Sequence, residues 1–216
     1  MRVLHIFSGS GHLNKAFSDK GFEVISLDNC VNSEDGFFHY NIDFLDFDFS
    51  FFNPGHFDAI FIAFPCNTFS KANNGLHFWD KFLPKTKQGR NAIKMLMYLK
   101  KLLNHFSKAI FVIENPTSAL FSNFWFDFYL PGSHLKFYRL NQFNYGHPTA
   151  KQTDLCTNSD LLMLVERCYR VNGKIASVKL SNLSLKKRQA YPVEFSKFLA
   201  IYIFDSVAIK KNLNNA

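Results

Sequence analysis

The stretch Ala59-Ile60-Phe61-Ile62-Ala63-Phe64-Pro65-Cys66-Asn67-Thr68-Phe69-Ser70 joins an apolar run to a cysteine loop. The run 59–63, bounded by Asp58 and Pro65, is typical of a strand buried inside an α/β sheet. Pro65 has no backbone N–H to donate to a sheet ladder, so it ends the strand. Cys66 therefore lies at the sheet edge where ligands bind in open α/β folds. Its thiol is either a nucleophile or a small buried group that caps a core strand.

The N-terminus predicts a strand, a glycine loop and a helix. Residues 2–7 are the strand, Ser8-Gly9-Ser10-Gly11 is the loop, and 12–20 have helical periodicity. Glycines let a ligand approach the backbone, and the helix N-terminus offers free N–H groups, so the arrangement suits a nucleotide. The loop lacks the full dinucleotide pattern and the P-loop lysine. By itself it equally fits an ordinary strand-to-helix turn.

An acidic residue follows the second predicted strand, 22–27. Asp28 stands roughly 20 residues past the glycines, where an acid can accept hydrogen bonds from ribose hydroxyls. The alternative is an aspartate that starts a turn. Residues 40–45 are predicted to form a short third strand or a loop.

A second polar group is predicted at the same sheet edge as Cys66. Residues 70–87 read as a long mobile loop, of the kind that often covers a site. Residues 88–106 carry the apolar stripe of a core-facing helix. The next buried strand, 109–113, ends at Glu114-Asn115-Pro116. Glu114 is then either a partner of Cys66 or a solvated turn acid.

The remaining elements complete one doubly wound α/β domain, a mostly parallel Rossmann-like sheet with helices on both faces. We expect an aromatic segment that packs over the sheet, a strand at 135–143, a strand or, as the alternative, a helix at 161–171, a C-terminal helix at 193–209 and a disordered tail at 211–216.

Charge and cysteine usage narrow the function classes. The chain carries a formal net charge of +8, with a sequence pI of about 9.3. Residues 170–216 hold nine Lys or Arg and two acids, a net +7. This favours a nucleic-acid partner, although a basic solvated surface would look the same. The four cysteines lack zinc spacing or a disulfide framework, and no signal peptide or membrane-length apolar run is present. We expect an intracellular, cytoplasmic protein without membrane contact.

Four motifs in order resemble those of the DNA (cytosine-5)-methyltransferase family. They are Phe7-Ser8-Gly9-Ser10-Gly11, Pro65-Cys66-Asn67-Thr68-Phe69-Ser70, Glu114-Asn115-Pro116 and Tyr145-Gly146-His147-Pro148. The chain is most similar to compact phage and prophage methylases, which share the Ile-Glu-Asn-Pro form, the stretch 151–154 and the Arg-x-x-x-Pro of 188–192. The resemblance covers nearly the whole chain, 1–216, as a single domain.

The resemblance implies a mechanism and a set of site residues. Cys66 would attack carbon 6 of a flipped cytosine, Glu114 would hold ring N3 and the amino group, and Lys151 would be the basic member of the catalytic set. The cofactor would be S-adenosylmethionine, with no metal. Its binding residues would be Phe7, Ser8, Gly9, Gly11, Asp28, Asp43 and Pro65.

Two departures from the family pattern leave alternatives open. The family's later motif normally carries two Arg, whereas here Lys151 and Thr153 stand in those places. The segment available for target recognition, about 158–186, is small, so specificity is either short or supplied by a partner protein. We expect a monomer that methylates DNA, in a phage or restriction-modification setting. The alternatives are an RNA cytosine methyltransferase and a catalytically weak nucleic-acid-binding or anti-restriction protein with the same fold.

Overall fold

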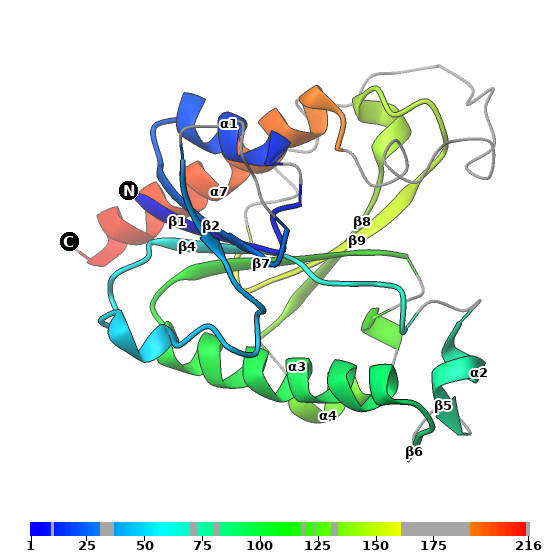
Figure 1. Cartoon of the computed structure of the whole chain (residues 1–216). Coiled ribbons are helices and arrows are strands. Elements are labelled where there is room, and N and C mark those ends of the chain that lie inside the picture. Colours follow the sequence, from blue (N-terminus) through cyan, green and yellow to red (C-terminus); the bar gives the residue numbers. More distant parts are fainter. Residues whose placement is uncertain are drawn as a thin grey trace.

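The computed structural model describes residues 1–9, 11–30, 37–69, 73–79, 83–117, 120–122, 124–130, 134–160 and 191–214. Its centre is a seven-stranded sheet in the order β3-β2-β1-β4-β7-β9-β8 (Figure 1). The strands are β1 (Arg2–Ile6), β2 (Glu23–Asp28), β3 (Phe38–Asn41), β4 (Ala59–Ala63), β7 (Ile110–Pro116), β8 (Lys136–Asn141) and β9 (Gln152–Thr157). The strands from β3 to β7 pair parallel, and β9 pairs antiparallel with both β7 and β8. The predicted mostly parallel sheet is confirmed.

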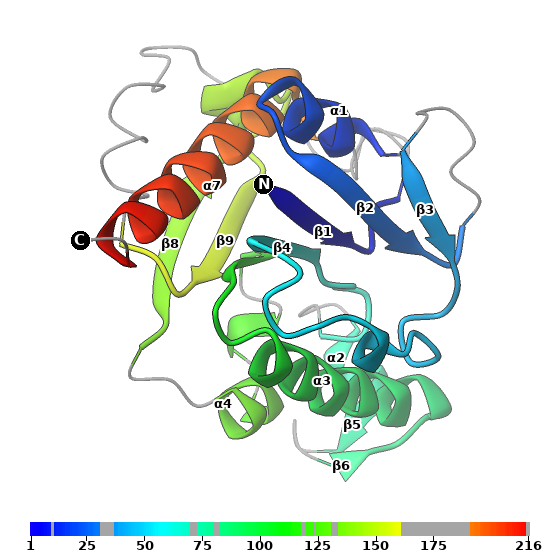
Figure 2. The same cartoon turned by 90° about the vertical axis from the view of Figure 1, so that its left-hand side faces the viewer.

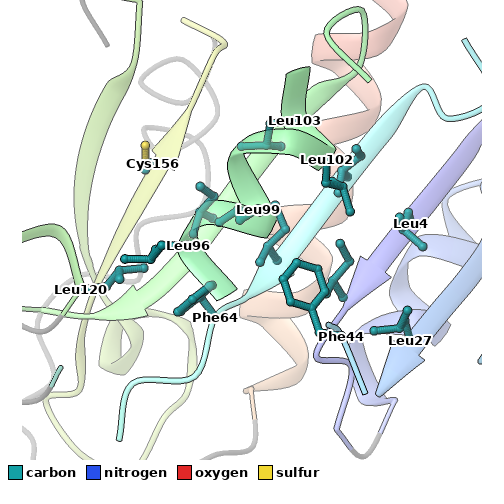
Figure 3. Packing of buried hydrophobic residues seen from close by; sticks show 14 of the residues in the cluster. Leu4, Leu27, Phe44, Phe64, Leu96, Leu99, Leu102, Leu103, Leu120 and Cys156 are labelled. Atoms are coloured by element: carbon teal, nitrogen blue, oxygen red, sulfur yellow. The ribbon is translucent and has the colours of Figure 1, made fainter. Parts of the chain in front are cut away.

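Helices cover both faces of the sheet (Figures 1 and 2). One face carries α1 (His12–Asp19) and α7 (Val193–Asn214), and the other carries α3 (Lys87–His105) and α4 (Phe124–Tyr129). Each layer has its own apolar core. On α3, Leu96, Leu99 and Leu102 are fully buried against the sheet, as the predicted stripe requires (Figure 3). The doubly wound architecture is therefore confirmed.

The segment expected to be a long mobile loop holds regular structure where it is described. It contains α2 (Asn74–His77) and a hairpin of β5 (Phe78–Trp79) and β6 (Leu83–Pro84). The Lys85 backbone N–H donates to the His77 carbonyl at 2.7 Å. A Cβ on Gly89 would lie 2.6 Å from the same carbonyl, so the helix α3 can approach only because this residue is glycine. The expectation of a segment without regular structure was wrong for these residues, because two-residue strands leave no periodic signal in the sequence.

Other boundaries also differ from the sequence predictions. The third strand lies at 38–41 instead of 40–45, and β9 was not predicted at all. The last helix runs through Asn214, so the tail expected to be disordered is helical over most of its length. Short 3₁₀ turns occur at η1 (Phe49–Phe51), η2 (Leu120–Ser122) and η3 (Gln142–Tyr145). The strand predicted at 161–171 lies outside the described residues.

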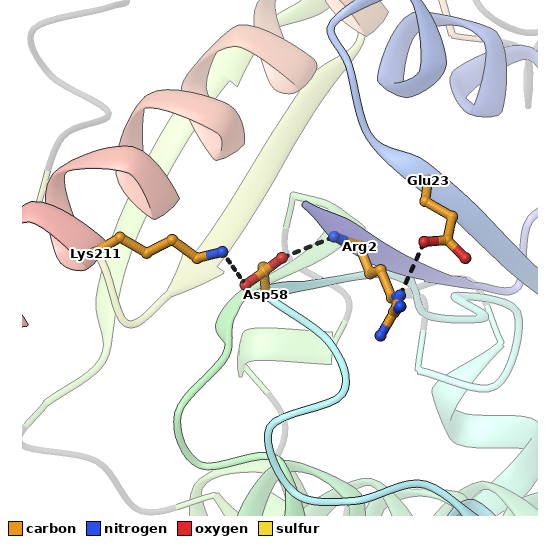
Figure 4. Close-up of polar contacts among 4 residues, drawn as sticks. All are labelled: Arg2, Glu23, Asp58 and Lys211. Atoms are coloured by element: carbon orange, nitrogen blue, oxygen red, sulfur yellow. Dashed lines mark hydrogen bonds and ion pairs between the residues drawn. The ribbon is translucent and has the colours of Figure 1, made fainter.

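The carboxylate of Asp58, just before β4, joins the two ends of the described chain (Figure 4). Its Oδ1 lies 2.7 Å from Lys211 Nζ on α7, and its Oδ2 accepts the Arg2 backbone N–H at 2.8 Å. The Arg2 side chain in turn pairs with Glu23 of β2. These contacts fasten α7 to the edge of the sheet opposite Cys66. No helix in the described ranges combines the length and apolar character needed to cross a membrane.

Candidate active site

The structure brings Cys66 and Glu114 to one edge of the sheet. Strands β4 and β7 run parallel, with Ala63 directly beside Glu114, and the cysteine loop follows the end of β4. The side-chain amide of Asn115 donates to the Phe64 carbonyl at 2.6 Å. This buried bond fastens the backbone that leads into Cys66 to the neighbouring strand.

Charges around the thiol act in opposite directions. Burial raises the pKa of the Cys66 thiol, the negative charge of Glu114 raises it further, and the ammonium of Lys151 lowers it. All three predicted catalytic side chains therefore lie within electrostatic reach of one another. The net effect raises the thiol pKa above its ordinary value, with burial as the largest cause.

Glu114 is only 5% exposed. Burial raises the pKa of its carboxyl, while Lys151, the Tyr191 hydroxyl and the Thr153 hydroxyl each lower it. The Tyr191 hydroxyl donates to Glu114 Oε2 at 2.8 Å, and the buried Oε1 has no hydrogen-bond partner among the described residues. A buried carboxyl with one free oxygen can exchange a proton or a hydrogen bond with a ligand.

Two residues of this cluster were missed by the sequence analysis. Tyr191 precedes α7 and reaches Glu114 across 77 positions of sequence. The only available signal was its place inside the Arg-x-x-x-Pro stretch of 188–192. Thr153, on β9, is fully buried, and its Oγ1 accepts from Gln142 Nε2 at 2.7 Å. It stands where the family motif carries an Arg, and it contributes a hydroxyl in place of a charge.

The glycine loop is fastened to the end of β2. The backbone N–H groups of Phe7 and Ser8 donate to the Leu27 carbonyl, and that of Gly9 donates to Asp28 Oδ2 at 2.8 Å. Phe7 has φ 60° and Gly9 has φ 54°. A phenylalanine held in the left-handed region is strained, and such strain concentrates at functional sites.

The other predicted cofactor residues border the same strand ends. The Phe7 ring packs on Phe44 and Phe64, with centroids 5.0 and 5.7 Å apart, and Pro65 beyond Phe64 is exposed. Asp43 is exposed, and its Oδ1 accepts the Leu45 backbone N–H at 2.8 Å. Asp28 Oδ1 likewise accepts the Cys30 N–H at 3.0 Å. Each carboxylate oxygen keeps a second lone pair for a ligand.

A cavity of about 730 Å³ lies between α1 and α7. Only Gly11, of the predicted cofactor residues, and Tyr191, of the catalytic cluster, belong to its lining. The cavity thus meets the back of the site and does not contain the thiol. We expect the site at the ends of the neighbouring strands β1, β4 and β7, which lead into the glycine loop, the Cys66 loop and Glu114. The described ranges hold no group of three or more His, Cys, Asp or Glu that could bind a metal.

Comparison with solved structures gives the same fold. S. pombe Dnmt2 methyltransferase aligns with TM-score 0.56 and 15% identity over 86% of this chain and 60% of its own. Entamoeba histolytica methyltransferase EhMeth aligns with TM-score 0.54 and 13% identity over 84% and 59%. A protein assigned as a DNA modification methyltransferase, encoded within an E. coli prophage, aligns with TM-score 0.51 and 14% identity over 73% and 46%. The chain has the fold of these methyltransferase structures.

The similarity of fold has no counterpart in the comparisons of sequence. No family model matches the sequence, and no curated protein matches it. The chain spans between 46% and 60% of the length of the three solved structures. The expected resemblance is confirmed for the fold, and the roles of the individual site residues remain predictions.

Proposed function

We propose that this protein methylates carbon 5 of cytosine in DNA through a covalent adduct with Cys66. The observation that carries the proposal is the pairing of a half-buried thiol with a buried carboxyl at adjacent strand ends, where the negative charge of Glu114 raises the pKa of the thiol. A thiol adds to carbon 6 of cytosine only if ring N3 gains a proton or an equivalent hydrogen bond. Glu114 is the group placed to supply it.

The two groups suit this addition because their protonation states are coupled. As the Cys66 thiolate forms the S–C6 bond, ring N3 takes a proton from Glu114, and carbon 5 becomes nucleophilic. After methylation ring N3 returns its proton to Glu114, and a base removes the carbon-5 proton. The C5–H electron pair then forms the C5=C6 double bond while the S–C6 electron pair returns to sulfur, which releases Cys66. Lys151 lowers the pKa of Cys66, so its ammonium favours the thiolate that attacks.

The residues at the glycine loop fit a bound S-adenosylmethionine, which would supply the methyl group. Ser8 Oγ is buried without a partner in the described parts of the chain. A Cβ on Gly9 would meet nothing within 4 Å, so the space in front of the loop is open. Asp28 and Asp43 offer carboxylate oxygens to hydroxyl and amino groups. These features support cofactor binding beside Cys66.

A base inside a duplex cannot reach Cys66, so the target must be flipped out. The segment that follows the cysteine loop contacts that loop, because Asn73 Nδ2 donates to the Asn67 carbonyl at 3.1 Å. We infer that the hairpin in this segment covers the flipped base. Trp79 on this hairpin is 59% exposed, with Lys85 Nζ 3.9 Å from its ring centroid. Exposed aromatic rings beside basic groups are suited to unpaired nucleotides.

The test is incubation with tritiated S-adenosylmethionine and DNA or RNA, followed by base analysis. We expect label in 5-methylcytosine from DNA, and none with Cys66→Ser. A second assay uses DNA in which target cytosines carry fluorine at carbon 5. Fluorine cannot leave as a proton, so the Cys66 adduct should survive denaturing electrophoresis. If label appeared only in RNA, the substrate would be RNA and not DNA. If the protein bound nucleic acid but produced neither label nor adduct, the result would favour the anti-restriction alternative.

A further inference from the structure

The Tyr191 hydroxyl donates to Glu114 Oε2 at 2.8 Å, and the Thr153 hydroxyl is the other side-chain group whose hydrogen bonding lowers the pKa of this carboxyl. Tyr191 comes from the segment leading into α7, far along the chain from either catalytic strand. Its ring is held edge-on against Phe61 of β4, with centroids 6.3 Å apart, and tilted against Phe195 of α7 at 5.7 Å. The hydroxyl is therefore aimed at Oε2 by packing on two sides.

The bond decides which oxygen of Glu114 carries the proton. Oε2 accepts the Tyr191 hydroxyl, whereas Oε1 is buried without a partner in the described chain. A neutral carboxyl has one hydroxyl oxygen and one carbonyl oxygen, and the carbonyl oxygen is the better acceptor. When Glu114 is neutral, its proton is therefore directed to Oε1. We propose that Tyr191 is a positioning residue for Glu114, which holds Oε2 and thereby presents a protonated Oε1 to the substrate base.

The hydrogen bond from Tyr191 to Glu114 also assists the proton transfer from Glu114 to the substrate base. Once Oε1 has given its proton to ring N3, Glu114 is a buried carboxylate, and a hydrogen bond to a carboxylate is about twice as strong as one to a neutral acid. Burial and the adjacent Glu114 raise the pKa of Tyr191 well above its usual value, so its hydroxyl stays a donor throughout. Burial raises the pKa of the Glu114 carboxyl, and Tyr191 stabilises the carboxylate that forms when the proton leaves. This inference rests on the proposed function for its catalytic part only.

The experiment measures the pKa of Glu114 directly and then the rate. The chain has five glutamates, so ¹³C-carboxyl labelling of glutamate gives few NMR signals, and Glu114→Gln assigns the relevant one. In Tyr191→Phe the ring packing is kept and the donor is lost, so the pKa of Glu114 should rise. The turnover number should fall about tenfold, the size expected for one hydrogen bond to a charged group, with unchanged KM for both substrates. The pH at which the rate declines should move upward by the same amount as the NMR pKa.

Tyr202→Phe is the matched control. Tyr202 is a fully buried tyrosine on α7 whose hydroxyl interacts with Thr157 Oγ1 at 3.1 Å, away from Glu114. Its loss should lower stability and leave the Glu114 pKa and the pH profile unchanged. Site-specific 3-fluorotyrosine at 191 should shift the Glu114 pKa in the direction opposite to that of Tyr191→Phe. Its more acidic hydroxyl donates more strongly and should therefore lower the Glu114 pKa.

An unchanged Glu114 pKa in both folded 191 variants would overturn the inference. So would a lower turnover number with an unmoved pH profile, which a merely structural role would produce. The NMR measurement needs no catalysis. If the wild type transfers no methyl group, the proposed function fails, while the positioning of Glu114 by Tyr191 is still decided.

Discussion

The Asn115 side chain joins the Phe64 carbonyl, 2.6 Å from its Nδ2, to the Leu120 backbone N–H, 3.2 Å from its Oδ1. It is fully buried, so neither bond has water as a substitute. The residue next to Glu114 thus fixes the backbone that carries Cys66, and one dipeptide positions both catalytic groups.

Asn115→Ala should reduce methyl transfer at least tenfold with unchanged affinity for S-adenosylmethionine. The control is Asn158→Ala. Asn158 follows β9, and its side chain likewise bridges two backbone groups near the start of β7, the Phe111 N–H and the Ala109 carbonyl. Each variant should lower the free energy of unfolding by about 1–3 kcal/mol. Equal losses of activity in the two variants would mean that Asn115 acts through stability alone.

The reactivity of Cys66 should follow the charges around it. Glu114→Gln removes the negative charge that raises the thiol pKa and should speed alkylation by iodoacetamide at neutral pH several-fold. Lys151→Met removes the charge that lowers the pKa and should slow it. Mass spectrometry of the Cys66 peptide gives the rates. Cys30, whose pKa is raised chiefly by Asp28, is the internal control, and parallel changes at Cys30 would count against local electrostatics.

Glu114→Gln should stabilise the fold at alkaline pH while abolishing activity. Burial raises the folded-state pKa of Glu114 above the value of about 4.3 for an unfolded glutamate. The folded protein therefore binds this proton more tightly, and the fold loses stability as pH rises from the unfolded pKa through the folded pKa. The melting temperature of the variant should exceed that of the wild type at pH 8, and the difference should shrink toward pH 4. Glu194→Gln, at an exposed glutamate of α7, should show no such trend.

Gly9→Val should weaken S-adenosylmethionine binding measured by calorimetry. A β-branched residue at φ 54° costs about 1–3 kcal/mol of backbone strain, and its side chain would enter the open space in front of the loop. Gly55→Val is the control, because its Cβ also meets nothing within 4 Å but its φ is not in the left-handed region. If folded Gly9→Val and wild-type protein bound S-adenosylmethionine with equal affinity, the cofactor site would have to lie elsewhere.

DNA binding should depend strongly on salt and weakly on sequence. Neutralising Lys186, Lys187 and Arg188, which lie outside the described residues, should weaken binding equally across sequences and flatten the salt slope by about one per residue. A control with the same charge change neutralises the exposed Lys94, Lys101 and Lys108. Identical salt slopes in both triple variants would show that the basic segment is not part of the DNA interface.

Bisulfite sequencing of a methylated plasmid tests sequence specificity. A unique site of six bases or more would contradict the short context expected from the small recognition segment.

The sequence predicted what depends on unbroken apolar runs. Strands 59–63 and 109–113 are buried on both faces, so their composition alone marks them, and parallel pairing then brings Cys66 and Glu114 to one edge. Tyr191 could not be predicted in the same way, because its contact with Glu114 depends on how α7 docks. The strand β9 was missed because Thr153 and Asp154 are polar residues buried by hydrogen bonds, which a hydrophobic pattern does not reveal.

One carboxylate, that of Asp58, touches both the first strand and the last helix. The N-terminus and the end of α7 therefore lie on the same side of the molecule, where β4 begins (Figure 1). A linker could join them, and the chain could be reopened in a surface turn such as that at Gly55, giving a circular permutant. For the same reason, a reporter or a sequence-reading module fused to either end would lie away from Cys66 and Glu114, so that the proposed methyl transfer could be directed to chosen sites.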